Sequence, residues 1–219
     1  AEEKKNKTDQ LLLTSPAPVW KIVLGKYLGM VTIYLIPVLI AGLYPFILSK
    51  YGTVSYSMAF TAIIGFFFLG CAHLSIGLFL SSITESQVIA AVLTFAALFC
   101  SFMMNGIESF FSQTAITSMM AFLVLAVVAA VFVYQMTKDN LLTGITGIVL
   151  AGIVLIVYFV KSSLYEGAIQ KLLDLLAVTN HFDNFVGGIL DLTGIVYMLS
   201  VICIFVFLTI QSIQKRRWS

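Results

Sequence analysis

The chain has 219 residues, of which 60% are hydrophobic and only 10% are charged, and its mean hydropathy is +1.05. Soluble domains carry about 25% charged residues, so this composition excludes a soluble globular domain and indicates an integral membrane protein. The net charge of +2 is small and the basic residues lie at the ends of apolar runs, which argues against a nucleic-acid partner.

Residues 1–18 carry the highest density of charged residues in the chain. Acidic and basic residues between Glu2 and Asp9 are followed by three leucines, and Pro16 and Pro18 break the backbone before the next apolar run. This pattern predicts a short polar helix with an apolar docking edge, which ends at the prolines. A solvated leader ahead of a membrane span is the alternative interpretation.

Apolar runs recur along residues 19–219, and a run of about 20 such residues crosses a bilayer core of about 30 Å. They predict an all-α, polytopic membrane helix bundle with six transmembrane helices, at about 20–48, 58–83, 88–106, 115–136, 141–160 and 192–213. Pro37 and Pro45 lie within the first span, where a membrane helix tolerates a kink. Thr84, Glu85 and Ser86 predict a tight turn between the second and third spans.

Residues 163–178 follow a different pattern, in which apolar and polar side chains occupy separate faces of a helix. The apolar set at four-residue spacing is Leu164, Ala168, Leu172 and Leu176, with Tyr165, Ile169 and Leu173 beside it, and the polar set is Glu166, Gln170 and Asp174. The pattern predicts an amphipathic helix that lies in the membrane interface and either packs against lipid or caps an exit path. Residues 179–191, which mix aromatic, acidic and glycine residues, suggest a shallow re-entrant segment.

Two kinds of residue inside the spans invite a functional interpretation. His73 is a functional candidate because an ionisable ring at membrane depth needs a partner or a cavity, but no acidic residue stands on its span, so a neutral ring bonded to a backbone carbonyl is favoured. Cys71, Cys100 and Cys203 lack metal-ligand spacing and a disulfide framework. Buried thiols that pack as small hydrophobes are the favoured interpretation.

The sequence contains no G-x-x-x-x-G-K-[ST] phosphate loop, no H-E-x-x-H or G-x-S-x-G motif, and no paired carboxylates within the spans. It therefore favours a protein that is not an enzyme and does not hold ATP by such a loop. A secondary transporter is an alternative, but it calls for charged residues inside the spans to couple an ion gradient. An intramembrane enzyme is less favoured still.

The basic residues predict an orientation by the positive-inside rule. With residue 1 in the cytoplasm, six crossings return the C-terminus to the cytoplasm, and nine of the twelve basic residues fall inside. The three outside are Lys50, Lys161 and Lys171. This orientation places the amphipathic helix on the outer face.

Three stretches resemble the type-2 ABC transporter permeases. The first comprises Ala1, Glu2, Glu3, Lys4, Lys5, Thr8, Leu11, Leu12, Leu13, Thr14, Ser15 and Pro16, followed by residues 20–26. The second is residues 84–91, which is similar to a short cytoplasmic turn of the family. The third is residues 181–185 with Gly188, Asp191, Leu192 and Tyr197, which resembles the gliding-motility and copper-maturation branch.

The resemblance implies a permease subunit of an ATP-binding cassette exporter in the plasma membrane. It assigns ATPase coupling to the first stretch from Glu2 to Pro16 and to Glu85, and an outer gate or interface to Leu172, Leu176, His181 and Asp183. It implies a separate ATP-binding subunit that holds ATP and Mg²⁺, a second permease copy or homologue, contact with membrane lipid, and no cofactor or metal in this chain. Members of the family carry two further membrane helices before the coupling segment, which we expect to be missing here.

Overall fold

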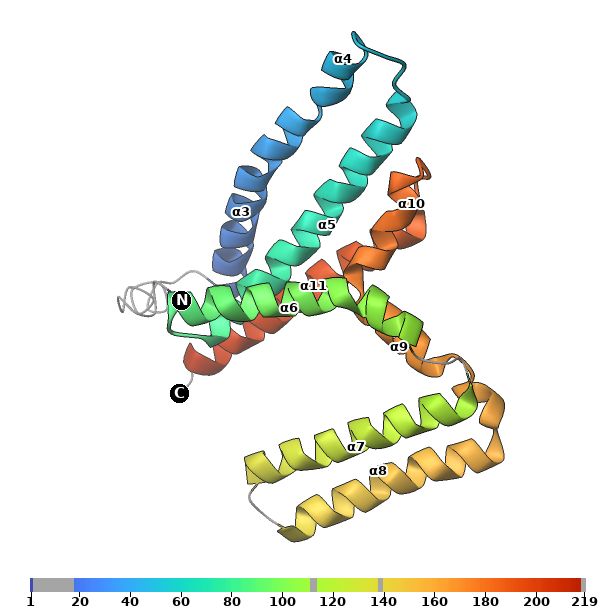
Figure 1. The fold of residues 1–219 in the computed structure, drawn as a ribbon. Helices are drawn as coiled ribbons and strands as arrows, with labels where there is room; N and C mark the ends of the chain where they lie inside the picture. Colours follow the sequence, from blue (N-terminus) through green and yellow to red (C-terminus); the bar gives the residue numbers. More distant parts are fainter. Residues whose placement is uncertain (2–17, 111–113, 138–139, 218–219) are drawn as a thin grey trace. The chain divides into compact units, whose positions relative to one another are not determined.

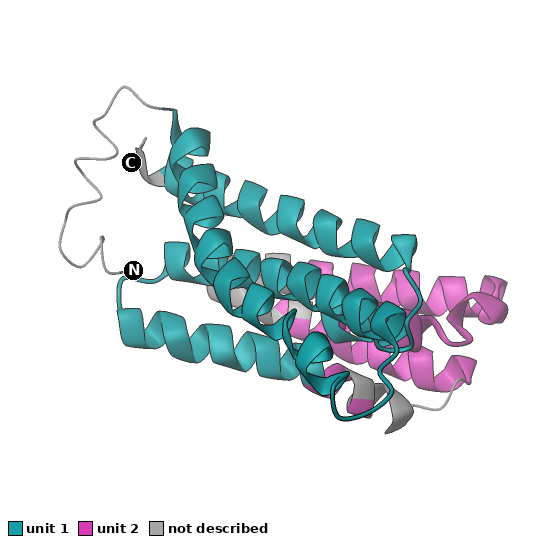
Figure 2. Ribbon diagram, turned by 90° about the horizontal axis from the view of Figure 1, so that it is seen from above, with its two compact units in different colours: residues 1–102, 178–219 teal, residues 103–177 magenta. Residues whose placement is uncertain are grey.

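The computed structural model describes residues 1, 18–110, 114–137 and 140–217. These residues form helices joined by short turns and contain no strand, so the predicted all-α class is confirmed (Figure 1). The structure has two compact units, unit 1 with residues 1–102 and 178–219 and unit 2 with residues 103–177 (Figure 2). The predicted segment 1–18 lies outside the described residues except at its two ends.

Long apolar helices account for most of unit 1. They are α3 (Val19–Ala41), α5 (Tyr56–Ile83), α6 (Gln87–Phe110, of which residues 87–102 belong to unit 1) and α11 (Leu192–Arg217). With the short helix α4 (Tyr44–Leu48) added to α3, these are the four helices of the described residues that are long and apolar enough to cross a membrane. A bent pair in unit 2 makes a fifth if it counts as one span, so the number six stays a prediction.

The first predicted span differs from expectation in where it breaks. Pro37 lies inside α3, which continues to Ala41. The break follows at Gly42 and Leu43, and Pro45 lies in the first turn of α4, where a proline loses no helical hydrogen bond. The chain therefore continues as a helix through Pro37 and breaks just before Pro45, which lies at the start of the next helix.

Helix α5 is the centre of unit 1, because α3, α10 (Asp183–Val186) and α11 all pack against it. Two tyrosines two turns apart on α3 tie it to α5. Tyr27 Oη donates to the Cys71 carbonyl at 3.0 Å and Tyr34 Oη donates to the Phe66 carbonyl at 2.8 Å. Since the later tyrosine meets the earlier carbonyl, the two helices run antiparallel, side by side in Figure 1.

The connector between residues 178 and 191 consists of η2 (Val178–Phe182), α10 and a turn. Phe185 of α10 is fully buried against α5 at Gly65. A Cβ at position 65 would lie 2.5 Å from Phe185 Cγ, so only a glycine lets the connector approach this closely. The Val178 amide donates to Ser101 Oγ at 3.2 Å, which fixes the start of the connector to α6.

Unit 2 contains α7 (Ala115–Thr137) packed along α8 (Asn140–Val160), followed by η1 (Ser162–Tyr165) and α9 (Ala168–Leu176). The chain bends by 116° between α8 and the segment from Ser162 to Leu176. Within the range 163–178, for which the sequence predicts an amphipathic helix, the structure has the end of η1 and then the α-helix α9. Gly167 has a φ of 68°, a left-handed conformation that breaks the helix and that glycine adopts at little cost.

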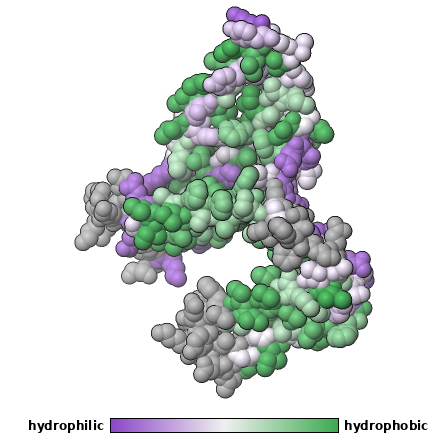
Figure 3. Space-filling model, viewed as in Figure 1, coloured by the Kyte–Doolittle hydropathy of each residue, from purple (hydrophilic) through white to green (hydrophobic). Residues whose placement is uncertain are grey.

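Large apolar side chains cover much of the described surface, as the green areas of Figure 3 show. Ile33 on α3 and Phe95 on α6, for example, are 71% and 70% exposed. Such extensive apolar exposure is untenable in water, whereas lipid tails accommodate it. The chain is therefore a multi-pass membrane protein.

Candidate functional site

The residues from Glu2 to Pro16, which the sequence assigns to ATPase coupling, lie outside the described residues. Glu85, the remaining member of that set, is exposed in the turn between α5 and α6. The predicted tight turn at 84–86 is confirmed, because α5 ends at Ile83 and α6 begins at Gln87.

One end of unit 1 gathers three segments that are far apart in the sequence. The start of α3 at Val19 and Val23 packs against Val206 and the last turns of α11. Because α3 and α5 are antiparallel, the end of α5 and the turn with Glu85 lie at the same end as the start of α3. The entry into α3, the Glu85 turn and the C-terminal end of α11 thus share one end of the unit (Figure 1).

The face of α9 that packs within unit 2 combines residues that the sequence pattern places on the apolar side with one that it places on the polar face. Tyr165 and Ile169 are buried, the Ile169 amide donates to Ser118 Oγ of α7 at 3.4 Å, and Gln170, expected on the polar face, is only 8% exposed. The predicted apolar residues Leu172 and Leu176 are instead 37% and 51% exposed. These two leucines are available to lipid or to a partner.

His181 and Asp183 belong to unit 1, so the structure describes them separately from the two leucines of unit 2. The His181 ring stacks on the ring of Tyr197. Asp183 is exposed at the start of α10. The structure does not bring the two side chains into one bonded cluster, and their predicted role as an outer gate stays a prediction.

Asp191, which belongs to the third stretch that resembles the permease family, has a structural function. It precedes α11 as its N-cap, where its Oδ1 accepts from the Thr193 amide at 2.9 Å and its Oδ2 accepts from Asn184 Nδ2 at 2.8 Å. The bond from Asn184, followed by those from Gly194 and Thr193, lowers the pKa of Asp191 below its ordinary value of 3.8. An Asp directly before an apolar run is a typical N-cap signal, which made this residue detectable.

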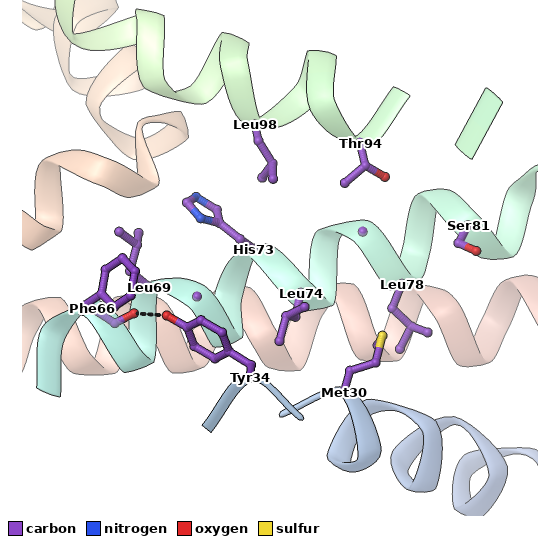
Figure 4. Close-up of a pocket in the computed structure, with 12 residues that line it drawn as sticks. Met30, Tyr34, Phe66, Leu69, His73, Leu74, Leu78, Ser81, Thr94 and Leu98 are labelled. Carbon is purple, nitrogen blue, oxygen red and sulfur yellow. Dashed lines mark hydrogen bonds between the residues drawn. The ribbon is translucent and has the colours of Figure 1, made fainter. Parts of the chain in front are cut away.

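A cavity of about 420 Å³ lies between α3, α5 and α6 in unit 1 (Figure 4). Apolar side chains make most of its wall, among them Met30 of α3, Leu74 and Leu78 of α5, and Leu98 of α6. Its volume falls within the range of about 300–1,000 Å³ typical of small-molecule sites. The sequence pattern did not indicate it, because the three helices that enclose it have to be packed before it exists.

Among the described side chains that border this cavity, His73 of α5 is the ionisable one with a nitrogen-containing ring (Figure 4). Its Nε2 atom is buried and has no hydrogen-bond partner within the described part of the chain, so this nitrogen does not make the expected bond to a backbone carbonyl there. Two other polar side chains of the wall are engaged, since Tyr34 donates to the Phe66 carbonyl and Thr94 Oγ1 donates to the Ala90 carbonyl at 2.7 Å. An unsatisfied buried polar group costs about 1–3 kcal/mol. A ligand that forms a hydrogen bond with His73 Nε2 removes this cost.

Metal binding finds no support in the part of the chain that the structure describes, where no three His, Cys, Asp or Glu side chains lie close enough to hold an ion. The described helices and their apolar surfaces define a polytopic membrane protein. A family model described as "ABC-2 family transporter protein" matches residues 1–115, more than half of the chain. The chain belongs to this family of transporters, and comparison with curated proteins and with solved structures gives no match.

Proposed function

We propose that the chain is the membrane-spanning permease subunit of an ATP-binding cassette exporter, which a separate ATPase subunit energises. The observation that carries this proposal is the family match over residues 1–115, a range that includes the charged N-terminal segment and helices α3, α5 and α6. The ATPase subunit supplies the site for ATP and Mg²⁺, since the sequence contains no phosphate loop.

The shared end of unit 1 supports a single docking surface for the ATPase. It joins the residues entering α3, the Glu85 turn and the end of α11, which carries Lys215. The positive-inside rule favours the cytoplasm for this end, with the C-terminus on the same side. The leucines at 11–13 contact the ATPase in this proposal, while Glu2, Glu3, Lys4 and Lys5 set the register and the choice of partner.

Transport follows the alternating-access scheme of a permease pair, formed with a second copy or with a homologue. ATP binding closes the two ATPase subunits, and the permease state with higher affinity for the closed ATPase becomes populated. Helices α3 and α5 move together in this scheme, because Tyr27 and Tyr34 bond them at two levels. We assign the protein to the plasma membrane and to the gliding-motility and copper-maturation branch, with two further membrane helices preceding the coupling segment.

The test is recovery of the ATPase subunit with the purified permease. Burial of a leucine is worth about 1.5–3 kcal/mol, whereas an exposed ion pair contributes about 0–1 kcal/mol. Leu12→Asp or Leu13→Asp should therefore weaken ATPase binding at least about tenfold. Glu3→Lys should weaken it less, and by an amount that depends on salt.

Leu12→Met is the matched control, because it keeps an apolar side chain of similar volume and should retain the ATPase. Each variant is checked for unchanged thermal unfolding of the membrane helices. Full recovery of the ATPase with both aspartate variants would remove the coupling role from this segment.

A further inference from the structure

The cavity between α3, α5 and α6 lies deep within the predicted spans. His73 stands ten residues before the end of α5 at Ile83, which corresponds to about 15 Å along the helix axis. A hydrocarbon core is about 30 Å thick, so the imidazole lies near its middle. A ligand that reaches this nitrogen therefore enters from lipid or through the bundle, and not from the water layer beside the membrane.

We propose that this cavity is a binding site for a neutral amphipathic molecule, with an apolar body and one hydrogen-bonding group that meets His73 Nε2. Its polar end pairs with the one buried side-chain nitrogen of the wall that lacks a partner. Neutral imidazole donates from one ring nitrogen and accepts at the other, so a hydroxyl group satisfies Nε2 in either tautomer. The inference concerns ligand binding alone and does not depend on an ATPase partner.

The charge of the lining selects against ionic ligands. Among the residues that the structure describes, none that borders the cavity is Asp, Glu, Lys or Arg. An ionised ligand would lie in a low-dielectric environment without a counter-charge, which is strongly unfavourable. A pure hydrocarbon fits the apolar wall but leaves Nε2 unpaired, so the site prefers an alcohol to an alkane of equal length.

The wall opposite His73 is preformed. Tyr34 packs against Gly70, where an added Cβ would overlap the tyrosine ring, and its hydroxyl is held by the Phe66 carbonyl. Figure 4 shows the Tyr34 ring on the α3 side of α5 and the His73 ring on the α6 side. A rigid wall reduces the entropy lost on binding, which favours a defined site over a transient packing gap.

The test uses the purified chain in lipid nanodiscs with a dodecanol derivative that carries a photoreactive diazirine. Mass spectrometry of the labelled peptides of α5 and α6 measures occupancy, and unlabelled 1-dodecanol and n-dodecane compete at equal mole fractions in the bilayer. We expect dodecanol to compete about tenfold more effectively than dodecane, because only the alcohol pairs with Nε2. Equal competition by both compounds would show that the cavity accepts any lipid chain without recognising the hydroxyl group, and this would overturn the proposal.

Two variants change the site in independent ways. His73→Phe should abolish the preference for the alcohol, whereas His73→Gln, which keeps a hydrogen-bonding side chain, should retain part of it. Leu98→Trp should fill the cavity and suppress labelling, and Ile33→Trp, which places the same ring on an exposed side of α3, should not.

Folding of each variant is checked by its thermal unfolding, and the comparison of the two competitors on the unmodified chain needs no variant. Absence of labelling in the folded wild-type chain would show that packing, for instance with a second copy, closes the cavity, and this too would overturn the proposal. A preference for the alcohol that persists in His73→Phe would exclude His73 as the recognising group.

Discussion

The imidazole of His181 lies flat on the phenol ring of Tyr197, with the ring centroids 3.8 Å apart and the ring planes 8° apart. The contact joins η2 to an early turn of α11, two segments that Phe185 also holds near α5. His181 therefore has a structural function in anchoring the connector, in addition to the outer-gate role proposed for it.

Loss of this stack should loosen the connector. We expect His181→Ala to lower the free energy of unfolding by about 0.5–1.5 kcal/mol beyond the lost burial, the usual worth of an aromatic pair. His181→Phe, which retains a flat ring, should preserve most of it. Thermal unfolding of the purified variants measures the effect, with the exposed Asp183→Ala as a control, and equal stability of all three variants would contradict a contribution from stacking.

The hydrogen bonds to Asp191 predict a dependence of stability on pH. Because the folded-state pKa lies below 3.8, ionised Asp191 stabilises the folded protein above its unfolded-state pKa, and this contribution is lost as the pH falls through the lower folded-state pKa. The stability difference between wild type and Asp191→Asn should thus be largest at neutral pH and shrink in acid. Chemical denaturation between pH 7 and pH 2 measures it.

Asn184→Ala tests whether the hydrogen bond from Asn184 causes this pH dependence of stability. It removes the leading hydrogen bond to Asp191, so the acid-dependent part of the difference should become smaller. Asp183→Asn removes a neighbouring exposed carboxylate and serves as the control. A difference between wild type and Asp191→Asn that does not change with pH would refute the assigned cause.

The exposed leucines of α9 predict a functional effect without unfolding. Leu172→Glu combined with Leu176→Glu should reduce transport or substrate-stimulated ATPase activity and leave binding of the ATPase subunit intact, because these side chains lie outside the buried face of α9. Ile169→Glu, which buries a charge against Ser118, should instead destabilise unit 2. Normal transport by the double variant would show that α9 is only a connection.

Topology is tested by labelling single cysteines in a background without Cys71, Cys100 and Cys203. The exposed Lys171 of α9 serves as the position on the proposed outer side. Lys171→Cys should react with an impermeant thiol reagent added to intact cells, whereas Lys138→Cys, at a position outside the described residues, should react only after permeabilisation. Labelling of Lys138→Cys in intact cells would invert the proposed orientation.

The sequence alone determined the class of this protein and most of its helix boundaries. The uncharged run predicted over 58–83 is α5 (Tyr56–Ile83), and the run predicted over 192–213 begins with α11 at Leu192. Transfer of each apolar run into lipid requires its own backbone hydrogen bonds to be satisfied locally, so length and composition suffice to place a membrane helix.

Tertiary packing decided which face of each helix is buried. Gln170 is buried and Leu172 exposed because α9 turns Ile169 toward Ser118, and the Nε2 atom of His73 borders a cavity that forms only where α3, α5 and α6 come together. In lipid, apolar residues are stable on both the packed and the exposed face of a helix, so hydrophobic periodicity loses the information about burial that it carries in water. Only the close approach of particular helices, as at Gly65 and Phe185, supplies that information.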